Sequence, residues 1–178
     1  MRKVQIREST LELIVGDITK QDTTAIVNAA NNRLAPGGGV AGAIHRAAGP
    51  ELLDECKKLR GCETGEAKIT KGYDLPAQYV IHTVGPVYSG SPDDAKHLAA
   101  CYKESLILAK KHGIQSISFP SISTGYFRYP LEEASTIALQ TITEELKKIP
   151  EIKVIRFVLY DTKTLTIYEK ALDALPIN

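Results

Sequence analysis

Residues 25–48 read AIVNAANNRLAPGGGVAGAIHRAA, and this stretch decides the fold. It opens with the apolar, β-branched run Ala25–Asn28, passes through asparagines and three glycines, and continues as a helical stretch that begins near Ala41. Short β-branched runs are typical of strands. A strand that leads through a glycine-rich loop into a helix is the repeating unit of α/β proteins. The stretch therefore predicts an α/β fold.

The same alternation of strand and helix extends along the rest of the chain. Strands are predicted at Val4–Ile6, Leu11–Val15, Ala25–Asn28, Ala67–Thr70, Tyr79–Val84, Ser116–Phe119 and Val154–Tyr160. Helices are predicted over Asp93–His112, Pro130–Lys148 and Thr164–Leu175, the first two from apolar residues at three- and four-residue spacing. Several strands are apolar nearly throughout, which suits strands covered on both faces, and the first two favour a hairpin. We expect a layered α/β fold with a mixed sheet flanked by helices.

Composition narrows the class of protein. The chain has 178 residues, with 43% hydrophobic and 24% charged, which predicts one globular domain over residues 1–178. The net charge of +1 makes nucleic acid an unlikely partner, and no apolar run has the length of a membrane helix. The three cysteines, Cys56, Cys62 and Cys101, form no CxxC pair, so neither a disulfide framework nor a metal site is indicated. With no secretory signal, a cytoplasmic location is the default expectation.

Ligands of α/β proteins bind at the carboxyl ends of strands, so the loops that follow strands are the first candidates for a site. Four such loops stand out: Gly16–Thr19, residues 28–40 with Asn28, Asn31, Asn32 and the glycine run, Ser121–Arg128, and Tyr160–Asp161.

The glycine run Gly37–Gly39 has two interpretations. Glycines let the backbone approach a phosphate, and the free amides of a helix start point at the anion. The run is equally explained as a flexible turn. It fits neither the GxxxxGK[ST] pattern of nucleotide hydrolases nor the GxGxxG pattern of dinucleotide-binding proteins. No GxSxG nucleophile elbow occurs either.

The polar residues of these loops also leave alternatives open. Asn28, Asn31 and Asn32 suit turns, but their amides would equally bind the hydroxyls of a ribose. Asp17 is either a helix N-cap or the acceptor for an exocyclic amine. His82 lies inside an apolar strand, where a hydrogen-bonded core histidine is the favoured interpretation.

Taken in order, the motifs resemble those of the macrodomain family. They are GDIT at 16–19, AIVNAAN at 25–31, GGGVAGAIHRAAGP at 37–50, YVIHTVGP at 79–86 and SISFPSISTGYFRYP at 116–130, followed by an aromatic residue that ends the last strand. The resemblance spans Leu13–Tyr168, and the bacterial and MacroD-like branch is the most similar. It implies a three-layer α/β/α macrodomain with a mixed, mostly parallel sheet. Members of that branch remove ADP-ribose from acidic residues and deacetylate O-acetyl-ADP-ribose.

The resemblance also implies roles for residues. Asp17 and Ile18 would contact adenine, and Tyr160 would stack on it. The diphosphate would lie between Gly37, Gly38, Gly39 and Val40 on one side and Ser121, Ser123, Thr124, Gly125 and Tyr126 on the other. Asn28 and Asn31 would lie near the distal ribose, which Phe127 would orient, and Asn31 and Phe127 would belong to the catalytic end. No cofactor or metal is implied.

Two positions depart from the pattern of that branch. Ala41 stands where the pattern has an aspartate that positions or activates water, and Arg128 stands where it has glycine. The implied partners are ADP-ribose or O-acetyl-ADP-ribose and ADP-ribosylated proteins. The expected function is ADP-ribose binding with hydrolysis of ADP-ribose esters that is weakened by Ala41. A non-catalytic reader of ADP-ribosylated protein is the alternative, and an RNA-binding or purely structural domain is a third, disfavoured by the charge.

Overall fold

The computed structural model describes residues 1–177, so only the last position of the predicted domain lies outside it. Its strands form one seven-stranded sheet in the order β1-β2-β7-β6-β3-β5-β4. The strands are β1 (Arg2–Ile6), β2 (Ser9–Val15), β3 (Ala25–Ala29), β4 (Ala67–Lys71), β5 (Tyr79–Thr83), β6 (Ser116–Phe119) and β7 (Val154–Leu159). Every predicted strand is present, within two residues of its predicted ends.

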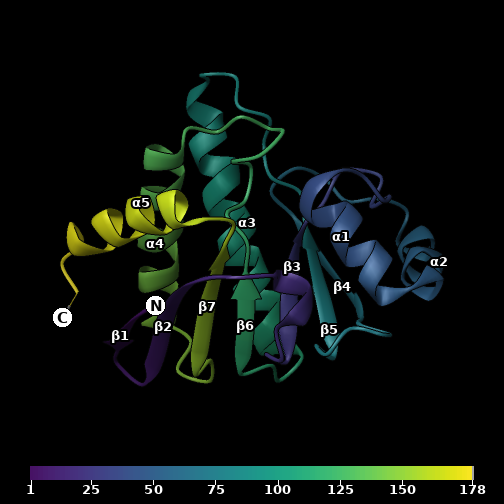
Figure 1. Ribbon diagram of the computed structural model, residues 1–178, viewed down its shortest axis with the longest axis horizontal. Coiled ribbons are helices and arrows are strands. Elements are labelled where there is room, and N and C mark those ends of the chain that lie inside the picture. The colour runs from purple at the N-terminus through teal and green to yellow at the C-terminus, as the bar shows by residue number, and fades with distance from the viewer. Residues whose placement is uncertain (178) are drawn as a thin grey trace.

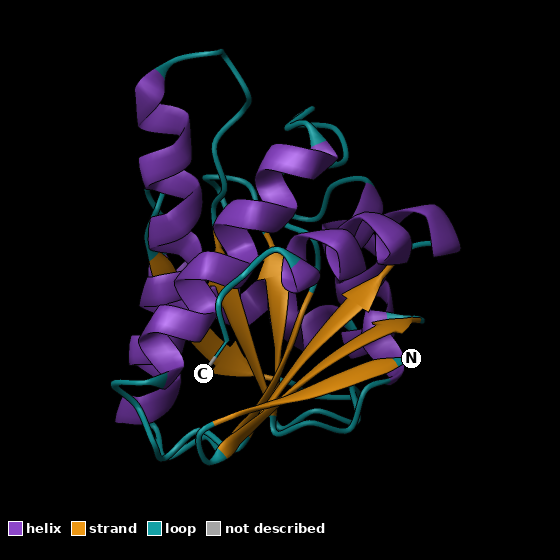
Figure 2. Cartoon of the chain, turned by 90° about the vertical axis from the view of Figure 1, so that its left-hand side faces the viewer, coloured by secondary structure: helices purple, strands orange, loops and turns teal. Residues whose placement is uncertain are grey.

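The sheet is parallel in its middle and antiparallel at both edges. Strands β2, β7, β6, β3 and β5 run in one direction. At the two edges, β1 pairs with β2 and β4 pairs with β5 in the opposite direction. The hairpin at the start of the chain and the mixed character of the sheet are therefore confirmed. Figure 2 shows the twist of the sheet as a fan of strands.

Helices cover both faces of the sheet and enclose two separate cores. The helices are the short 3-10 turn η1 (Ile18–Lys20), α1 (Gly39–Ala48), α2 (Pro50–Leu59), α3 (Pro92–Lys111), α4 (Leu131–Leu146) and α5 (Thr162–Asp173). Buried residues of α3, α4 and α5 pack in the larger core, while those of α1 and α2 pack in the smaller one. In Figure 1 these two helix groups lie on either side of the strand ends. The arrangement is the predicted three-layer α/β/α fold.

Helix α2 is the element that sequence reasoning missed. Pro50 occupies its first turn and Arg60 ends it in a left-handed conformation, with φ of 58°. Only Leu52 and Cys56 of its ten residues are buried, so its apolar stripe is too narrow to stand out in the sequence. Cys56 lies inside this helix, packed in the smaller core.

The connections of β3 and β6 are of the kind that leaves a crevice between two strands, and we use this name for the strand-exit edge of the sheet from β2 to β3. The chain leaves β3 through α1 on one face of the sheet and leaves β6 through α4 on the other. Neighbouring strands whose connections diverge in this way leave a gap at their carboxyl ends, which is the usual ligand position in open α/β sheets.

None of the helices in residues 1–177 has the length and apolar character that a membrane-spanning helix needs.

A buried polar network ties β3, β5 and β4 together below this crevice. His82 is fully buried, and its Nδ1 lies 3.1 Å from Asn28 Nδ2 while its Nε2 lies 2.9 Å from Thr70 Oγ1. Burial, together with a smaller effect of the nearby His45, lowers the pKa of His82 to about 3. The expectation that His82 is a hydrogen-bonded core histidine is confirmed. The network also fixes the orientation of the Asn28 amide.

The pKa of His82 predicts a loss of stability in weak acid. The unfolded chain takes up a proton on this imidazole near pH 6.5, whereas the folded chain does so only near pH 3, so falling pH favours the unfolded state between those values. The free energy of unfolding should fall by about 1.4 kcal/mol per pH unit from this group alone. Urea unfolding of the parent and of His82→Gln at pH 7.5 and 5.0 isolates the contribution of His82 to this loss of free energy. The parent should lose about 2 kcal/mol more than the variant; equal losses would mean that His82 takes up its proton as readily in the folded protein as in the unfolded chain.

Candidate functional site at the carboxyl ends of the strands

The exits of β2 and β7 lie side by side at one end of the crevice. Val15 pairs with Leu159 in register, and Gly16 N–H donates to the Leu159 carbonyl at 3.1 Å. The residues that follow β2 and β7 are therefore neighbours, which brings Asp17 close to Tyr160. The Tyr160 side chain is 91% exposed, although aromatic rings are usually buried. An exposed ring beside a carboxylate provides a flat stacking surface and an acceptor.

Asp17 uses one carboxylate oxygen for the fold and leaves the other free. Its Oδ1 accepts hydrogen bonds from Thr19 N at 2.9 Å and Thr19 Oγ1 at 2.7 Å, so it caps η1. The Thr19 hydroxyl and amide lower the pKa of Asp17 and keep it ionised. Within the described residues, Oδ2 has no hydrogen bond. The expected role of Asp17 as an N-cap is confirmed, and it leaves Oδ2 free. The following Ile18 is buried against the smaller core.

The glycine loop places the uncapped first turn of α1 at the crevice. Gly38 is the N-cap of α1 and offers no side-chain cap, and Gly39 adopts a left-handed conformation with φ of 58°. Among the described residues, nothing accepts a hydrogen bond from the N–H groups of Gly39, Val40 and Ala41. Free amides at a helix start favour an anion. Val40 is half-buried and packs on the smaller core, which anchors the first turn.

Two buried tyrosines hold the facing loop, residues 121–127. Ser121 Oγ lies 2.7 Å from Tyr168 Oη of α5, and Ile122 N–H donates to Tyr102 Oη of α3 at 3.1 Å. Thr124 Oγ1 donates to the Ser121 carbonyl at 3.0 Å, which closes the loop on itself. Sequence reasoning missed both tyrosines as positioning residues. Their only signal was an aromatic residue on the buried stripe of each helix.

Ser123 is the strained residue of this loop. It has φ of 67° and is 6% exposed, and its hydroxyl is buried without a hydrogen-bond partner in residues 1–177. A Cβ on Gly85, which follows β5, would lie 2.2 Å from Ser123 Oγ, so only glycine fits beneath it. Strained residues with unused polar groups tend to cluster at binding sites. Arg128 also takes a left-handed φ, 61°, where the family pattern has glycine.

Tyr126 brings the two loops together. Its side chain is 81% exposed, yet a Cβ built on Gly38 would lie only 2.8 Å from its Cε2 atom. The tyrosine ring therefore lies across the glycine loop from the opposite side of the crevice. Gly125 beside it is exposed, and Phe127 is half-buried with its carbonyl accepting from Tyr88 N–H at 2.8 Å.

The asparagines at the exit of β3 serve different purposes. Asn31 Oδ1 accepts from Ala35 N–H at 3.0 Å and its Nδ2 donates to the Ala35 carbonyl at 2.9 Å, so this side chain shapes the loop. The same Nδ2 lies 3.5 Å from where a Cβ on Gly37 would stand, beside the glycine loop. Asn28 is 1% exposed, and its Oδ1 is buried without a partner among the described residues.

Ala41 lies in the first turn of α1, one turn before His45. Residues four apart on a helix share a face, so Ala41 and His45 point the same way. Both are buried, at 6% and 8% exposure. Burial lowers the pKa of His45, and its Nε2 lacks a partner among residues 1–177. This neutral imidazole was not among the predicted site residues, although its four-residue spacing from Ala41 was a usable signal.

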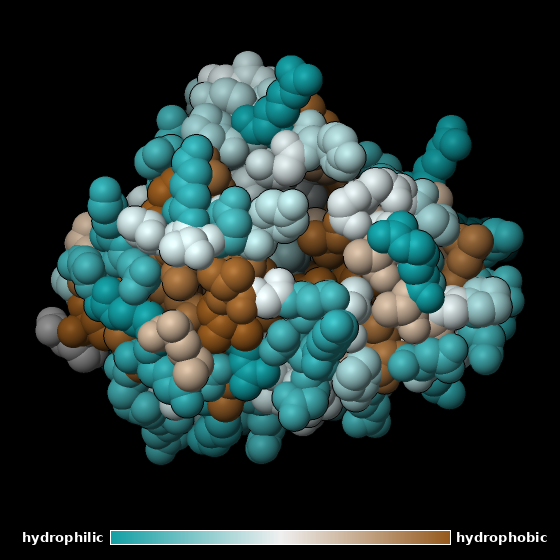
Figure 3. All heavy atoms as spheres, viewed as in Figure 1, coloured by the Kyte–Doolittle hydropathy of each residue, from teal (hydrophilic) through white to brown (hydrophobic). Residues whose placement is uncertain are grey.

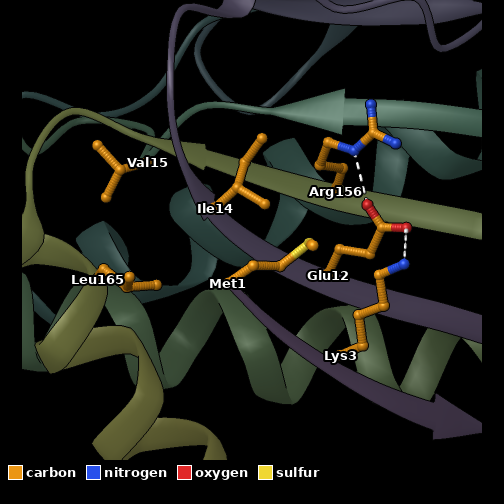
Figure 4. Close-up of a pocket in the computed structure, with 7 residues that line it drawn as sticks. All are labelled: Met1, Lys3, Glu12, Ile14, Val15, Arg156 and Leu165. Atoms are coloured by element: carbon orange, nitrogen blue, oxygen red, sulfur yellow. Dashed lines mark hydrogen bonds and ion pairs between the residues drawn. The ribbon is translucent and has the colours of Figure 1, made fainter.

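A separate depression of about 570 Å³ lies on the open face of β1, β2 and β7, outside this crevice. Figure 4 shows its polar part: Glu12 accepts from Arg156 Nε at 2.7 Å and faces Lys3 Nζ at 3.9 Å. Arg156 also lies 3.6 Å from Asp22, so each of these charges has a partner within the protein. The other half of the depression is apolar and is lined by Met1, Ile14, Val15 and Leu165. Figure 3 shows that the face of the molecule drawn in it has apolar surface in the middle, ringed by polar side chains.

The fold and this edge define a three-layer α/β protein whose strand exits present free backbone amides and an exposed aromatic ring at one edge of the sheet. The sequence matches the Macro domain family over residues 27–138. It is 53% identical to "Macro domain-containing protein CT2219" of Chlorobaculum tepidum, over 92% of this chain and 96% of that protein. It is also 51% identical to the human ADP-ribose glycohydrolase MACROD2, over 95% of this chain and 41% of that protein. The chain belongs to the Macro domain family.

Solved structures agree. A mutant of the Oceanobacillus iheyensis macrodomain, determined with ADPR, superposes with a TM-score of 0.93 at 46% identity. The match covers 97% of this chain and 96% of that one.

Close packing between α1 and the glycine loop predicts that Gly42→Ala destabilises the protein. A Cβ at Gly42 would lie 2.2 Å from the Gly37 carbonyl oxygen, a backbone atom that cannot rotate away. The overpacking costs about 1–3 kcal/mol, more than the gain of about 1 kcal/mol when alanine replaces glycine in a helix. Thermal unfolding should show a lower Tm. Gly125→Ala is the control, since no described atom lies within 4 Å of a Cβ there. An unchanged Tm for Gly42→Ala would mean that the loop is free to move.

Proposed function

We propose that this chain binds ADP-ribose along the crevice. The observation that carries the proposal is the order of groups at the strand exits: an aromatic ring with a free carboxylate oxygen, two facing loops of amides and small residues, and asparagines at the far end. Strands lie about 4.8 Å apart, so β2, β7, β6 and β3 span about 14 Å. That length accommodates an extended ligand with a base, a diphosphate and a second sugar.

Each part of the crevice matches one part of such a ligand. Tyr160 offers its ring to adenine and Asp17 Oδ2 accepts from the exocyclic amine. The free amides of Gly39 to Ala41 and the Ser121–Tyr126 loop bind the diphosphate from two sides, without a side-chain cation. Asn31 and Phe127 border the distal ribose. The relative solved with ADPR and the glycohydrolase name of the human relative both support this assignment.

The first test separates the two oxygens of Asp17. Asp17→Asn can keep the cap of η1 through its amide oxygen while replacing the free acceptor with an NH2 donor. We expect its affinity for ADP-ribose, measured by calorimetry, to fall by about 1–3 kcal/mol, the usual cost of a lost charged hydrogen-bond partner, with Tm nearly unchanged. Thr19→Ala is the matched control, because it removes a cap contact and leaves Oδ2 in place. Full affinity in Asp17→Asn would remove this carboxylate from the site.

We further propose that the chain hydrolyses ADP-ribose esters, O-acetyl-ADP-ribose and ADP-ribosyl groups on protein carboxylates, at a reduced rate. Position 41 carries a methyl group, which neither holds nor deprotonates water. His45 Nε2, one helical turn after Ala41, and Asn28 Oδ1 are both buried without a hydrogen-bond partner in residues 1–177. A neutral imidazole is able to accept a proton, so slow turnover is expected rather than none. The reader function is the alternative that a complete absence of turnover would favour.

The second test restores the acid. Ala41→Asp should raise the rate of deacetylation of O-acetyl-ADP-ribose at least about 100-fold, the lower range for one general base. Affinity for ADP-ribose should fall slightly, because a carboxylate close to a diphosphate is repulsive. Ala41→Asn is the control, since it has the same shape without the charge. Equal rates in the parent and in Ala41→Asp would mean that another group activates the water. A loss of turnover in His45→Gln would then identify that group as His45.

A further inference from the structure

A second depression, of about 360 Å³, lies beyond the asparagine end of the crevice. It is lined by Asn32, Arg33, Cys56, Lys57, Arg60 and Gly61. Asn32 and Arg33 directly follow Asn31, so the Cα of Arg33 lies within about 8 Å of the Cα of Asn31. The depression therefore begins where the distal end of the proposed ligand lies, and we name it the basic pocket.

Hydrogen bonds and close packing join the two segments that form the wall of the basic pocket. Asn32 Nδ2 donates to the Cys62 carbonyl at 3.0 Å, and Cys62 N–H donates to the Asn32 carbonyl at 2.9 Å. A Cβ at Gly61 would lie 2.8 Å from that same carbonyl oxygen, and its φ is 84°. The β3 exit and the end of α2 are thus joined closely, which sets the positions of the side chains between them.

Three cations line the pocket and lack acidic partners. Arg33, Lys57 and Arg60 make no ion pair with any of the residues 1–177. Lys57 and Arg60 stand at the carboxyl end of α2, where cations offset the helix dipole. Arg33 comes from a different segment, and the dipole does not explain it. On a chain with a net charge of +1, three uncompensated cations in one depression form a local anion-binding surface.

We propose that the basic pocket binds acidic side chains of the polypeptide that carries ADP-ribose. This inference rests on the proposed function, because the ligand must leave its distal ribose near Asn31. ADP-ribose esters are formed on acidic residues, so further carboxylates beside the modified one would meet the three cations. A protein segment is favoured over nucleic acid because no aromatic side chain lines the pocket for base stacking.

The test compares two peptides that each carry ADP-ribose through a hydrolysis-resistant amide. In one peptide the modified residue is flanked by glutamates, and in the other by glutamines. Binding is measured for the parent, for Arg33→Glu with Lys57→Glu, and for the control Lys58→Glu with Lys103→Glu. The control makes the same charge change at exposed positions outside the pocket. We expect the parent to prefer the glutamate peptide about threefold to tenfold at low salt, and this preference to vanish in the pocket variant and in 0.5 M NaCl.

The outcomes separate the pocket from the crevice. Free ADP-ribose should bind all three proteins alike, and a parent that fails to bind it would refute the proposed function instead. An equal affinity of the parent for the two peptides, or a preference that survives the pocket reversal, overturns the proposal for the pocket. Stronger, pocket-dependent binding of an ADP-ribosylated oligonucleotide would also overturn it, in favour of nucleic acid.

Discussion

The parallel alignment of β2, β7, β6 and β3 is the constraint on which the site depends. It sends four strand exits to one edge of the sheet, where residues distant in sequence become neighbours. The hydrogen bond from Gly16 N–H to the Leu159 carbonyl continues this alignment one residue past the strands. Parallel strands need covering on both faces, so the same constraint requires the two cores and the helices that enclose them. The crevice follows from the divergence of α1 and α4 on opposite faces.

The loop at residues 121–127 is held in place by side chains of the larger core beneath it. Tyr102 and Tyr168 are fully buried, and each uses its hydroxyl to hold the start of the loop at Ser121 and Ile122. That support lets the next turn carry an unfavourable backbone at Ser123 and a hydroxyl without a partner in the described chain. Left-handed, non-glycine residues cost of order 1–3 kcal/mol when strained, so the surrounding core must hold them in place.

Sequence patterns predicted most of the fold because strand composition and helix periodicity are local signals. They missed α2, whose buried stripe is only Leu52 and Cys56 and whose start is a proline. The strand-exit loops were also found from sequence, because topology rules place ligands there. What local signals could not provide was contact between distant segments: the ring of Tyr126 across Gly38, Tyr168 beneath Ser121, and the pairing of Asn28 with His82. For Asp17, sequence reasoning treated an N-cap and an amine acceptor as alternatives, whereas the structure shows the cap on Oδ1 alone and so leaves Oδ2 available for the proposed second role.

The two proposed sites would recognise anions by different physics. In the crevice, neutral amides at the start of α1 and around Ser121 face the proposed diphosphate, so recognition there depends on backbone geometry and changes little with salt. In the basic pocket, Arg33, Lys57 and Arg60 act as exposed charges, whose attraction falls once the Debye length drops below the separation. The first kind selects a ligand by shape and the second selects its surroundings by charge. Ala41 contributes to the proposed diphosphate contact through its backbone amide, which a change of side chain leaves in place. A carboxylate at this position would therefore alter the proposed chemistry strongly and the binding of the diphosphate only slightly, through repulsion.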